Sequence, residues 1–432
     1  MHLTNEEDAV PRRPIDSLTP AEFRRLYLVP NRPVVLTGAT VGWRAASDWV
    51  TADGEPDLPA LARLFGKDVV PVADCSRNGR LGGRAAAACR DMRVAEYAAW
   101  WQGSGRASGE CLYLKDWTFA AKHPEYRAYH TPAPLADDWL NEHWAARRGE
   151  AEEVGDHRFV YLGPAGSTTP LHADVLFSYS WSANLCGVKH WQPCASMDSS
   201  VRARGRITSR HSLHRLLVPA SQRALVSDSA SDPLHGGLHA LSAAGGAPLE
   251  VTQRAGENDS RAGVESQSSH CAQPQRGRAR IGELLFVPSG WYHEVTNLTP
   301  VLSVNHNWLN GANATWALRR CSAYLAAIRA GLDPEDAADA TLCMQLLRRR
   351  AGVDLRELVA LAEGAADRRS RCREEHAGEA ATKEAEGEEE EWRRESLRVA
   401  RSLIDGVRSL AAETFGEEAW EELDMGASSA RG

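Results

Sequence analysis

The chain has 432 residues and a formal net charge of −8, with 43% hydrophobic and 25% charged residues. This composition excludes a wholly disordered chain, allows one large domain or two ordinary ones, and argues against a general binder of nucleic acids or anionic membranes. Of the 50 basic residues only five are lysines, so each position that keeps a lysine needs a reason.

The first part of the chain is predicted to alternate short helices with short strands. Helices are expected at residues 14–27, 58–65 and 94–102, and strands at residues 32–38, 68–74 and 112–117. Ser17 or Thr19 is a candidate cap for the first helix, and Pro20 suits its first turn. Residues 1–110 are therefore expected to form an N-terminal elaboration of helices and strands.

The centre of the chain is rich in short strands. They are predicted at residues 158–163, 176–183, 189–193, 283–288 and 301–308, with turns that contain Gly or Pro between them. Several short strands with few helices between them favour a β-sandwich or a β-barrel. We therefore expect a mainly β fold with helices, whose β core spans residues 111–315.

A long stretch interrupts this core. Residues 198–280 are dominated by small and polar residues and lack periodicity, which is typical of a long loop or a disordered insert. Ala255-Gly-Glu257 and Ile281-Gly-Glu283 flank its last part, so deleting residues 258–283 would place Ala-Gly-Glu directly before Leu284. We hypothesise that this segment is a lineage insertion or an unspliced piece of the gene. Uninterrupted reads of the mature message across these codons would refute the splicing alternative.

The period of the apolar residues becomes helical from residue 316 onward. Helices are predicted at residues 317–330, 337–350, 355–362 and 396–413, and the charged stretch 366–391 is interpreted as a solvated helix or an acidic linker. Residues 316–432 are therefore expected to form an α-helical C-terminal region. Its amphipathic helices are predicted to pack on the β core or, alternatively, to form a homodimer.

The sequence offers no sign of a membrane or secreted protein. No stretch approaches the ~18 consecutive apolar residues of a membrane span, and the acidic N-terminus lacks the apolar region of a signal peptide. Nine cysteines without a CxxC pair indicate free thiols rather than a zinc knuckle or a disulfide framework. We therefore expect the cytoplasm, with the nucleus as the alternative.

His172-Ala-Asp174 is the first candidate for chemistry. Residues two apart on an extended strand point to the same face, so this imidazole and carboxylate can take adjacent positions on one metal ion. A second histidine would complete the two-histidine, one-carboxylate triad of non-haem Fe(II) oxygenases. Alone the pair is weak evidence, because His123-Pro-Glu125 has the same spacing in a polar turn, and an ordinary histidine beside an acid is the alternative.

His293 is the preferred third ligand. It follows a buried strand, a Pro-Ser-Gly turn and the aromatic pair Trp291-Tyr292, so its imidazole is expected to enter an aromatic interior. A polar ring is costly there unless a metal or a backbone carbonyl satisfies its nitrogens. His306, which lies between two asparagines in a predicted strand, is the competing third ligand and ranks lower.

Lys189 ends an apolar and aromatic stretch of the chain. With nine arginines for each lysine in this sequence, a compact ammonium at this position suits a narrow pocket for one carboxylate, which a guanidinium would not fit. The alternative is a lysine that extends from the rim of a barrel. Trp181, Trp191 and Trp291 are expected either to line a dry cavity or to belong to the ordinary core.

Together these motifs resemble the jumonji-C (JmjC) family of Fe(II)- and 2-oxoglutarate-dependent oxygenases. The resemblance rests on His172-Ala-Asp174, the lysine seventeen residues after His172, and Gly290-Trp-Tyr-His293. It covers residues 14–320 without the insert and includes further stretches: Tyr113-Leu-Lys-Asp-Trp117, Asp138-Trp-Leu-Asn-Glu142, Ser180-Trp-Ser-Ala-Asn184 and Asn305-His-Asn-Trp-Leu-Asn310. The fold that it implies is a cupin-like double-stranded β-helix with N-terminal helices and an α-helical C-terminal region.

The resemblance also implies the roles of single residues. Three residues would hold Fe(II): His172, Asp174 and His293. Four would face the co-substrate 2-oxoglutarate: Lys189, Thr169, Tyr113 and Asn305. The Lys189 ammonium would pair with the distal carboxylate of 2-oxoglutarate, and the Thr169 hydroxyl would assist.

The function implied by the resemblance is protein hydroxylation, in particular lysyl hydroxylation of the eukaryotic translation termination (release) factor, which would promote termination. One alternative is a JmjC demethylase of histone lysine or arginine, which the lack of a zinc-reader module and of a basic patch weakens. The other is a non-catalytic cupin scaffold, which the intact set of site residues weakens. The expected partner is a protein substrate, without direct contact to nucleic acid or to a membrane.

Overall fold

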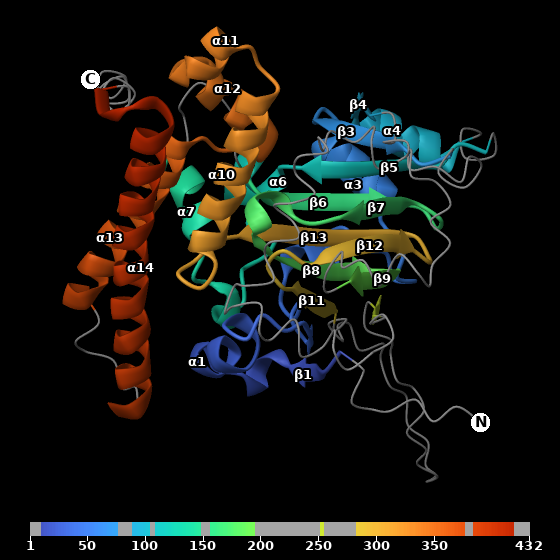
Figure 1. Ribbon diagram of the computed structural model, residues 1–432. Helices are drawn as coiled ribbons and strands as arrows, with labels where there is room; N and C mark the ends of the chain where they lie inside the picture. The colour runs from blue at the N-terminus through green and yellow to red at the C-terminus, as the bar shows by residue number, and fades with distance from the viewer. Residues whose placement is uncertain are drawn as a thin grey trace, which may run out of the picture.

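Two β-sheets form the centre of the structure, a computed structural model that describes residues 10–76, 89–103, 109–147, 156–194, 251–254, 282–375 and 383–418 (Figure 1). The strands of the larger sheet lie in the order β1 (Arg12–Pro14), β2 (Val34–Thr37), β11 (Glu283–Val287), β8 (Tyr179–Cys186), β13 (Val301–Trp308), β6 (Arg158–Gly163), β5 (Leu112–Trp117), β3 (Val69–Asp74) and β4 (Cys89–Arg93). The smaller sheet has the order β10 (Val251–Arg254), β9 (Val188–Cys194), β12 (Tyr292–Asn297) and β7 (Thr168–His172).

The two sheets face each other and share a small apolar core. Leu285 and Val287 of the larger sheet are buried together with Trp191 and Val295 of the smaller one. All pairings in the smaller sheet are antiparallel, and β12 lies between β9 and β7. The arrangement is a β-sandwich whose inner faces are partly polar, which places the candidate site residues between the sheets.

The N-terminal helices cover the outer face of the larger sheet. They are α1 (Pro20–Phe23), α2 (Arg44–Asp48), α3 (Leu58–Phe65) and α4 (Val94–Gln102), and α6 (Phe119–Lys122) follows β5. Their apolar side chains form one core with the outward residues of β5, β6, β8 and β13. Trp181 belongs to this core, so it is an ordinary core residue and does not line a cavity between the sheets. It stacks on His306, with their ring centroids 4.0 Å apart.

The predicted helix at residues 14–27 is divided in the structure. Pro14 ends β1, residues 15–17 form a 3-10 turn, and α1 begins only at Pro20 because the residue before a proline is held in an extended conformation. The side chain of Thr19 accepts a hydrogen bond from the Glu22 backbone N–H, and the Glu22 carboxylate accepts one from the Thr19 backbone N–H. Thr19 is therefore the cap, and a π-helical turn, Arg24–Leu28, continues the helix.

Two strand predictions need correction. The strand expected at residues 176–183 begins at Tyr179, because Val175–Phe177 forms a 3-10 turn in which Leu176 has a φ of 58°. The prediction of an unstructured insert through residues 198–280 is wrong at residues 251–254, which form β10 along β9. The rest of that stretch up to residue 280, including most of the hypothetical unspliced segment 258–283, lies outside the described residues.

The C-terminal helices form a second apolar core with α7 (Trp139–Ala146). They are α10 (Ala314–Ala330), α11 (Pro334–Ala338), α12 (Ala340–Ala351), α13 (Leu355–Glu375) and α14 (Lys383–Phe415), drawn in orange and red in Figure 1. Trp139 and Leu140 of α7 are buried among the apolar side chains of α10, α12, α13 and α14. The C-terminal helices thus pack on the rest of the chain, and a homodimer through them stays a prediction.

Two boundaries in this region differ from the sequence prediction. The helix expected at residues 337–350 is split at Asp339, whose carboxylate caps α12 by accepting from the Leu342 N–H. The proposed acidic linker 366–391 is helical wherever it is described, as the end of α13 and the beginning of α14. Ion pairs from Arg393 and Arg394 to Glu390, spaced at helical i,i+3 and i,i+4, support α14 there.

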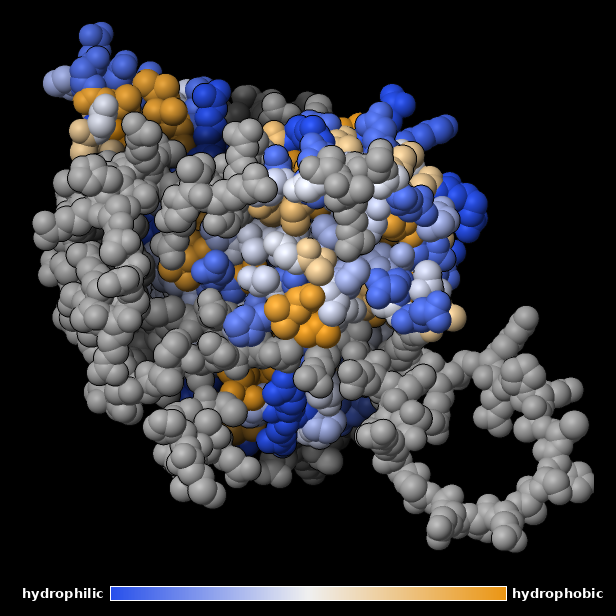
Figure 2. Space-filling model, turned by 90° about the vertical axis from the view of Figure 1, so that its right-hand side faces the viewer, coloured by the Kyte–Doolittle hydropathy of each residue, from blue (hydrophilic) through white to orange (hydrophobic). Residues whose placement is uncertain are grey.

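No helix in the part of the chain that is described combines the length and the apolarity that crossing a membrane requires. On the face drawn in Figure 2, the hydrophobic side chains outside the grey residues form small separate groups among hydrophilic ones.

Candidate metal and co-substrate site

Three side chains from two neighbouring strands of the smaller sheet meet at one point. His172 is the last residue of β7, Asp174 follows in the turn after that strand, and His293 stands opposite His172 on β12. One ligand atom from each lies within 4.8 Å of the others. The structure therefore brings together the three predicted ligands, although Asp174 lies beyond the strand that the two-residue spacing suggested.

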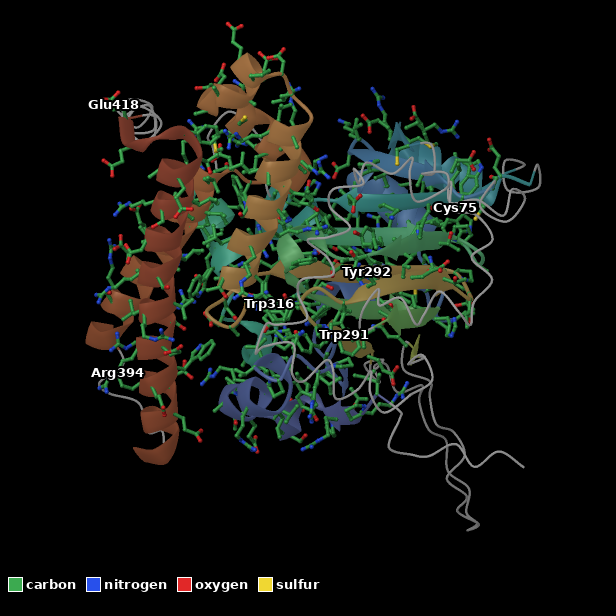
Figure 3. The ribbon with its side chains drawn as sticks, in the orientation of Figure 1. Cys75, Trp291, Tyr292, Trp316, Arg394 and Glu418 are labelled. Atoms are coloured by element: carbon green, nitrogen blue, oxygen red, sulfur yellow. The ribbon has the colours of Figure 1, made fainter. Side chains whose placement is uncertain are left out.

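The local chain explains how His293 reaches this point. β11 and β12 are joined by a tight turn in which the Trp291 N–H donates to the Pro288 carbonyl. Gly290 has a φ of 73° there, a left-handed conformation that favours glycine. The turn places Trp291 and Tyr292 at the start of β12 (Figure 3), and His293 is buried behind them.

Both histidines are oriented by the backbone. Nδ1 of His172 lies 2.9 Å from the Pro170 carbonyl oxygen, and Nδ1 of His293 lies 3.1 Å from the Trp291 carbonyl oxygen. A carbonyl only accepts, so each Nδ1 carries the proton and each Nε2 presents its lone pair. Burial lowers the pKa of His293, which keeps its ring neutral at pH 7. Two imidazoles held in this way are suited to bind a divalent metal.

The carboxylate of Asp174 also fits a metal site. Its Oδ1 lies 4.0 Å from Nε2 of His172, while its Oδ2 is buried and has no hydrogen-bond partner among the described residues. A buried carboxylate oxygen without a donor is costly, and a cation bound by the triad would satisfy it. Two imidazoles and one carboxylate are the donor set of non-haem Fe(II) sites.

His306, the competing third ligand, lies elsewhere. Its ring is on the outer face of the larger sheet, and its Nε2 lies 2.8 Å from the Tyr129 hydroxyl. Burial lowers the pKa of His306 well below its usual value, so it is a neutral core histidine. His123 of the similar His-x-Glu sequence bonds to Asp68 at 2.7 Å and is a structural histidine as well.

Lys189 bridges the two sheets. Its side chain is 1% exposed, and Nζ donates to the hydroxyls of Ser182 at 3.2 Å and Ser303 at 2.6 Å, both on the larger sheet. Burial, with a smaller contribution from the Lys115 charge, lowers the pKa of Lys189 to about 7. In the described part of the chain Lys189 forms no ion pair, so an anionic group that enters between the sheets would find an uncompensated cation.

The other predicted co-substrate residues surround the same space. Asn305 Nδ2 donates to Ser303 Oγ at 3.0 Å, so one hydroxyl connects Asn305 with Lys189. The Tyr113 side chain is buried and hydrogen-bonded to Thr169 of β7, and burial raises the pKa of Tyr113. All seven predicted site residues therefore lie on the inner faces of the two sheets or directly after β7.

Several residues of this region were not predicted from the sequence. Ser182 and Ser303 hold the lysine, and the ring of Tyr161 lies 5.8 Å from Nζ of Lys189. Gln253 of β10 accepts from Trp191 Nε1 at 3.1 Å and donates to the backbone carbonyls of Ser182 and Glu283, which ties β10 to the larger sheet. Serines and glutamines carry no pattern of their own, and only strand pairing places them here.

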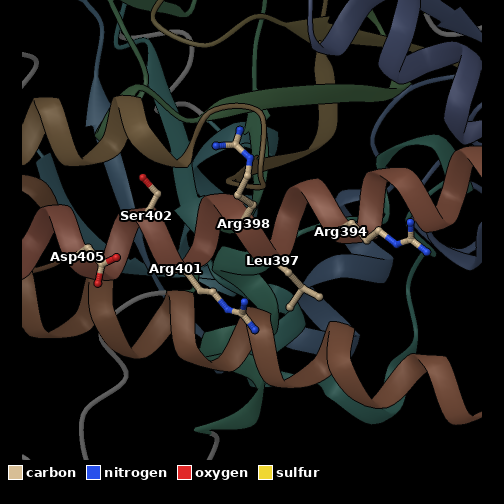
Figure 4. A pocket seen from close by; sticks show the side chains of 6 residues that line it. All are labelled: Arg394, Leu397, Arg398, Arg401, Ser402 and Asp405. Atoms are coloured by element: carbon tan, nitrogen blue, oxygen red, sulfur yellow. The ribbon is translucent and has the colours of Figure 1, made fainter.

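A separate hollow lies along α14 (Figure 4). It is lined by Arg394, Leu397, Arg398, Arg401, Ser402 and Asp405. Arg394 and Arg398 are paired with Glu390 and Glu395 of the same helix. Figure 3 places Arg394 on α14, well apart from Trp291 and Tyr292. This surface hollow offers no metal-ligand set, whereas the His172, Asp174 and His293 cluster between the sheets does.

Comparison with known proteins gives relatives over most of the chain. The chain is 35% identical over 353 residues to the 2-oxoglutarate and iron-dependent oxygenase JMJD4 of Gallus gallus. This match covers 79% of this chain and 71% of the Gallus gallus protein. It is 34% identical over 309 residues to the arginine-specific demethylase JMJ20 of Arabidopsis thaliana, covering 69% and 57%. A more distant relative, 25% identical over 310 residues, is the bifunctional arginine demethylase and lysyl-hydroxylase psr-1 of Caenorhabditis briggsae, covering 71% and 63%.

The extent of these matches differs between relatives. The match spans 59% of the JMJD4 of Danio rerio and 60% of the human one, less than two thirds of either protein. No model of a protein family matches the chain.

Proposed function

Because this chain belongs to the JmjC family of 2-oxoglutarate and iron-dependent oxygenases, we propose that it is a protein hydroxylase that uses Fe(II) and 2-oxoglutarate. The single observation that carries the proposal is the convergence, between two sheets, of a His-Asp-His cluster with a buried lysine that lacks a counter-ion among the described residues. A metal centre and a carboxylate pocket side by side are what this chemistry requires.

In this proposal His172, Asp174 and His293 hold the iron through two Nε2 atoms and a carboxylate oxygen. Iron bound there would supply the oxidising power, with one oxygen atom of O₂ entering a C–H bond of the substrate and the other entering the succinate that 2-oxoglutarate forms as it loses CO₂. The chain's own residues bind, orient and exclude water. Lys189 holds the distal carboxylate of 2-oxoglutarate, with Ser303 and Asn305 fixing the position of its ammonium.

Further residues shape the cavity. The hydroxyls of Thr169 and Tyr113 face the same space, and Trp191, whose ring centroid lies 5.5 Å from that of His293, keeps water away from the metal side. A double-stranded β-helix, in which the smaller sheet closes over the larger one, is the finer fold that we propose from the contacts of Lys189 and Gln253 across the sheets.

The proposed substrate is a lysine residue of the eukaryotic translation termination factor, and the proposed setting is the cytoplasm. Support comes from the likeness to JMJD4 proteins and from the word lysyl-hydroxylase in the name of psr-1. The names of JMJ20 and psr-1 also support a second candidate, demethylation of methylated arginine. Both reactions begin with hydroxylation of a carbon, so the same site serves either.

The experiment that tests the proposal has two stages. Binding of Fe(II) and 2-oxoglutarate is measured without oxygen, and succinate release is then followed in air with termination-factor peptides. Mass spectrometry is expected to show a gain of one oxygen on a lysine. Loss of a methyl group from a methylated arginine peptide, without that gain, would establish the second candidate instead.

Matched variants separate the site from the rest of the chain. His172→Ala is expected to lose succinate release and metal binding. His123→Ala, which removes the histidine of the similar sequence motif outside the site, is expected to keep both. Turnover that survives in His172→Ala would refute the assignment of the iron ligands.

A further inference from the structure

The pairing of β5 with β6 contains an irregularity beside the candidate site. Leu114 stands opposite Leu162, but the next pair is Trp117 with Val160, so two residues of β5, Lys115 and Asp116, oppose the single residue Tyr161. Asp116 has a φ of 53°, in the left-handed region. This is a β-bulge, a feature that redirects side chains and is frequent next to active sites.

The bulge brings both charged side chains to Tyr161. The Tyr161 hydroxyl donates to Asp116 Oδ1 at 2.7 Å, and Nζ of Lys115 lies 6.0 Å from the centroid of the Tyr161 ring. Without the extra residue, Lys115 and Asp116 would point to opposite faces of the sheet. Nζ of Lys189 lies 5.8 Å from the same ring, so one aromatic side chain connects Asp116 with the co-substrate pocket.

Asp116 differs from the other acids of this region. It is exposed, whereas Asp174 belongs to the proposed metal site and Glu294 lies on the face of β12 opposite to His293. A neutral acceptor would suffice to hold the Tyr161 hydroxyl. Among the described residues Asp116 forms no ion pair, so its exposed carboxylate can receive a charged group that comes from solvent.

We propose that the Asp116 carboxylate, oriented by Tyr161, receives the side-chain ammonium of the lysine that is hydroxylated. This inference rests on the proposed function and specifies its substrate class, a residue with a cationic end. The Lys189 ammonium, buried between the sheets, repels a cation from the inner pocket. The substrate ammonium therefore stays at Asp116, and the carbon atoms before it are presented to the metal side.

The test compares Asp116→Asn with the wild-type chain. Asparagine keeps a carbonyl oxygen for the Tyr161 hydroxyl and removes only the charge. Asp91→Asn, at an exposed acid of β4 in the same sheet, is the matched control. Binding of a fluorescent termination-factor peptide is measured without oxygen, and KM and kcat are measured in air, each with lysine or with uncharged norleucine at the target position.

The wild type and Asp91→Asn are expected to prefer the lysine peptide. For Asp116→Asn the Kd and KM of that peptide should rise about 10- to 100-fold, the loss typical of a hydrogen bond to a charged group. Norleucine binding and the KM for 2-oxoglutarate should change less than twofold, and Asp116→Glu should recover part of the preference. A purely structural role of Asp116 would instead raise the KM for 2-oxoglutarate and weaken both peptides equally.

The outcomes separate the two proposals. If the wild type hydroxylates the lysine peptide and Asp116→Asn keeps its preference for lysine, the assignment of Asp116 is wrong and the proposed function stands. If the wild type neither binds nor hydroxylates the lysine peptide but turns over a methylarginine peptide, lysyl hydroxylation is wrong and the role of Asp116 as receptor of a lysine ammonium falls with it.

Discussion

Replacing Lys189 by methionine tests the co-substrate pocket most directly. Methionine has nearly the length of the lysine stem and no charge, so the variant removes the ammonium without leaving a large cavity. It also removes a buried cation that only the hydroxyls of Ser182 and Ser303 compensate in the described part of the chain. We therefore expect Lys189→Met to fold at least as stably as the wild type at pH 7 while its affinity for 2-oxoglutarate falls.

The expected change in the KM for 2-oxoglutarate follows from the lost contact between the Lys189 ammonium and the carboxylate, and the expected change in stability follows from the pKa of Lys189. A hydrogen bond to a charged group contributes about 1.5–3 kcal/mol, which corresponds to a rise of about 10- to 100-fold in the KM for 2-oxoglutarate at pH 7. The pKa of Lys189 is about 7 in the folded chain against 10.5 for an unperturbed lysine. Between pH 7 and pH 10.5 Lys189 is therefore protonated in the unfolded chain but neutral in the folded chain. The free energy of unfolding of the ligand-free protein should then rise with pH across this window, by about 5 kcal/mol in total.

The same linkage governs binding of the co-substrate. Its carboxylate prefers the protonated lysine, so the affinity for 2-oxoglutarate should fall by up to about tenfold per pH unit above 7 and level off once the roughly 10- to 100-fold contribution of the ammonium is lost. The assay is the KM for 2-oxoglutarate from succinate release at pH 6.5 to 9, together with urea unfolding at the same pH values. Lys189→Met should lose both pH dependences and keep its metal affinity. Lys122→Met, at a lysine whose Nζ donates to the Val69 carbonyl outside the site, is the control.

Two results would refute this reasoning. A KM for 2-oxoglutarate that changes less than twofold in Lys189→Met at pH 7 would show that the ammonium does not hold the co-substrate. A wild-type pH dependence that persists in full in the variant would show that another group titrates. Parallel losses of metal affinity and of 2-oxoglutarate affinity would indicate a general disturbance of the space between the sheets.

The remaining predictions concern the metal, the support of Lys189 and the packing behind Tyr113. His172→Ala should lose metal binding in equilibrium dialysis while its unfolding curve changes little, because His172 is partly exposed. Ser303→Ala removes the hydroxyl that accepts from both Lys189 Nζ and Asn305 Nδ2, and should raise the KM for 2-oxoglutarate at least about fivefold without changing kcat. Gly163→Ala should destabilise the protein by about 1–3 kcal/mol in urea unfolding, because a Cβ there would lie 2.5 Å from the Tyr113 ring, whereas Gly387→Ala on α14 meets no atom within 4 Å and should be neutral or stabilising.

Local patterns in the sequence predict much of the fold. The bounds of α3, α4, β5, β6 and β13 agree with the predictions because each of these elements has a clear local apolar pattern, and α3, α4 and β6 also end at or directly before a glycine. The pairing of His172 with Asp174 was also predictable, since a strand spacing restricts where their side chains go. These features depend on residues close together in the chain, whereas the choice of His293 over His306 as their partner rested on the aromatic residues before His293 and on the resemblance to the JmjC family.

Most of what the sequence did not predict depends on residues far apart in the chain. β10 has only four residues, too few for a clear sequence pattern. It is a strand because it pairs with β9 and because Gln253 forms buried hydrogen bonds to the larger sheet. The division of residues 14–27 was missed although Pro20 was noted as a first-turn residue, because a proline also restricts the residue before it. The two serines that hold Lys189 come from β8 and β13, and only the packing of the two sheets makes them its neighbours.

The scarcity of lysine in this chain acquires a structural meaning at Tyr161. Lys189 and Lys115, two of only five lysines, both lie within about 6 Å of its ring, one buried between the sheets and one at the bulge of β5. A guanidinium needs space for a planar fork, and either place is bounded by aromatic rings. The buried Lys189 ammonium and the exposed Asp116 carboxylate both lie next to this tyrosine, so the charge changes from positive inside to negative outside. In the function that we propose, this change of charge would draw the dicarboxylate co-substrate to the inner position and keep a cationic side chain at the outer one.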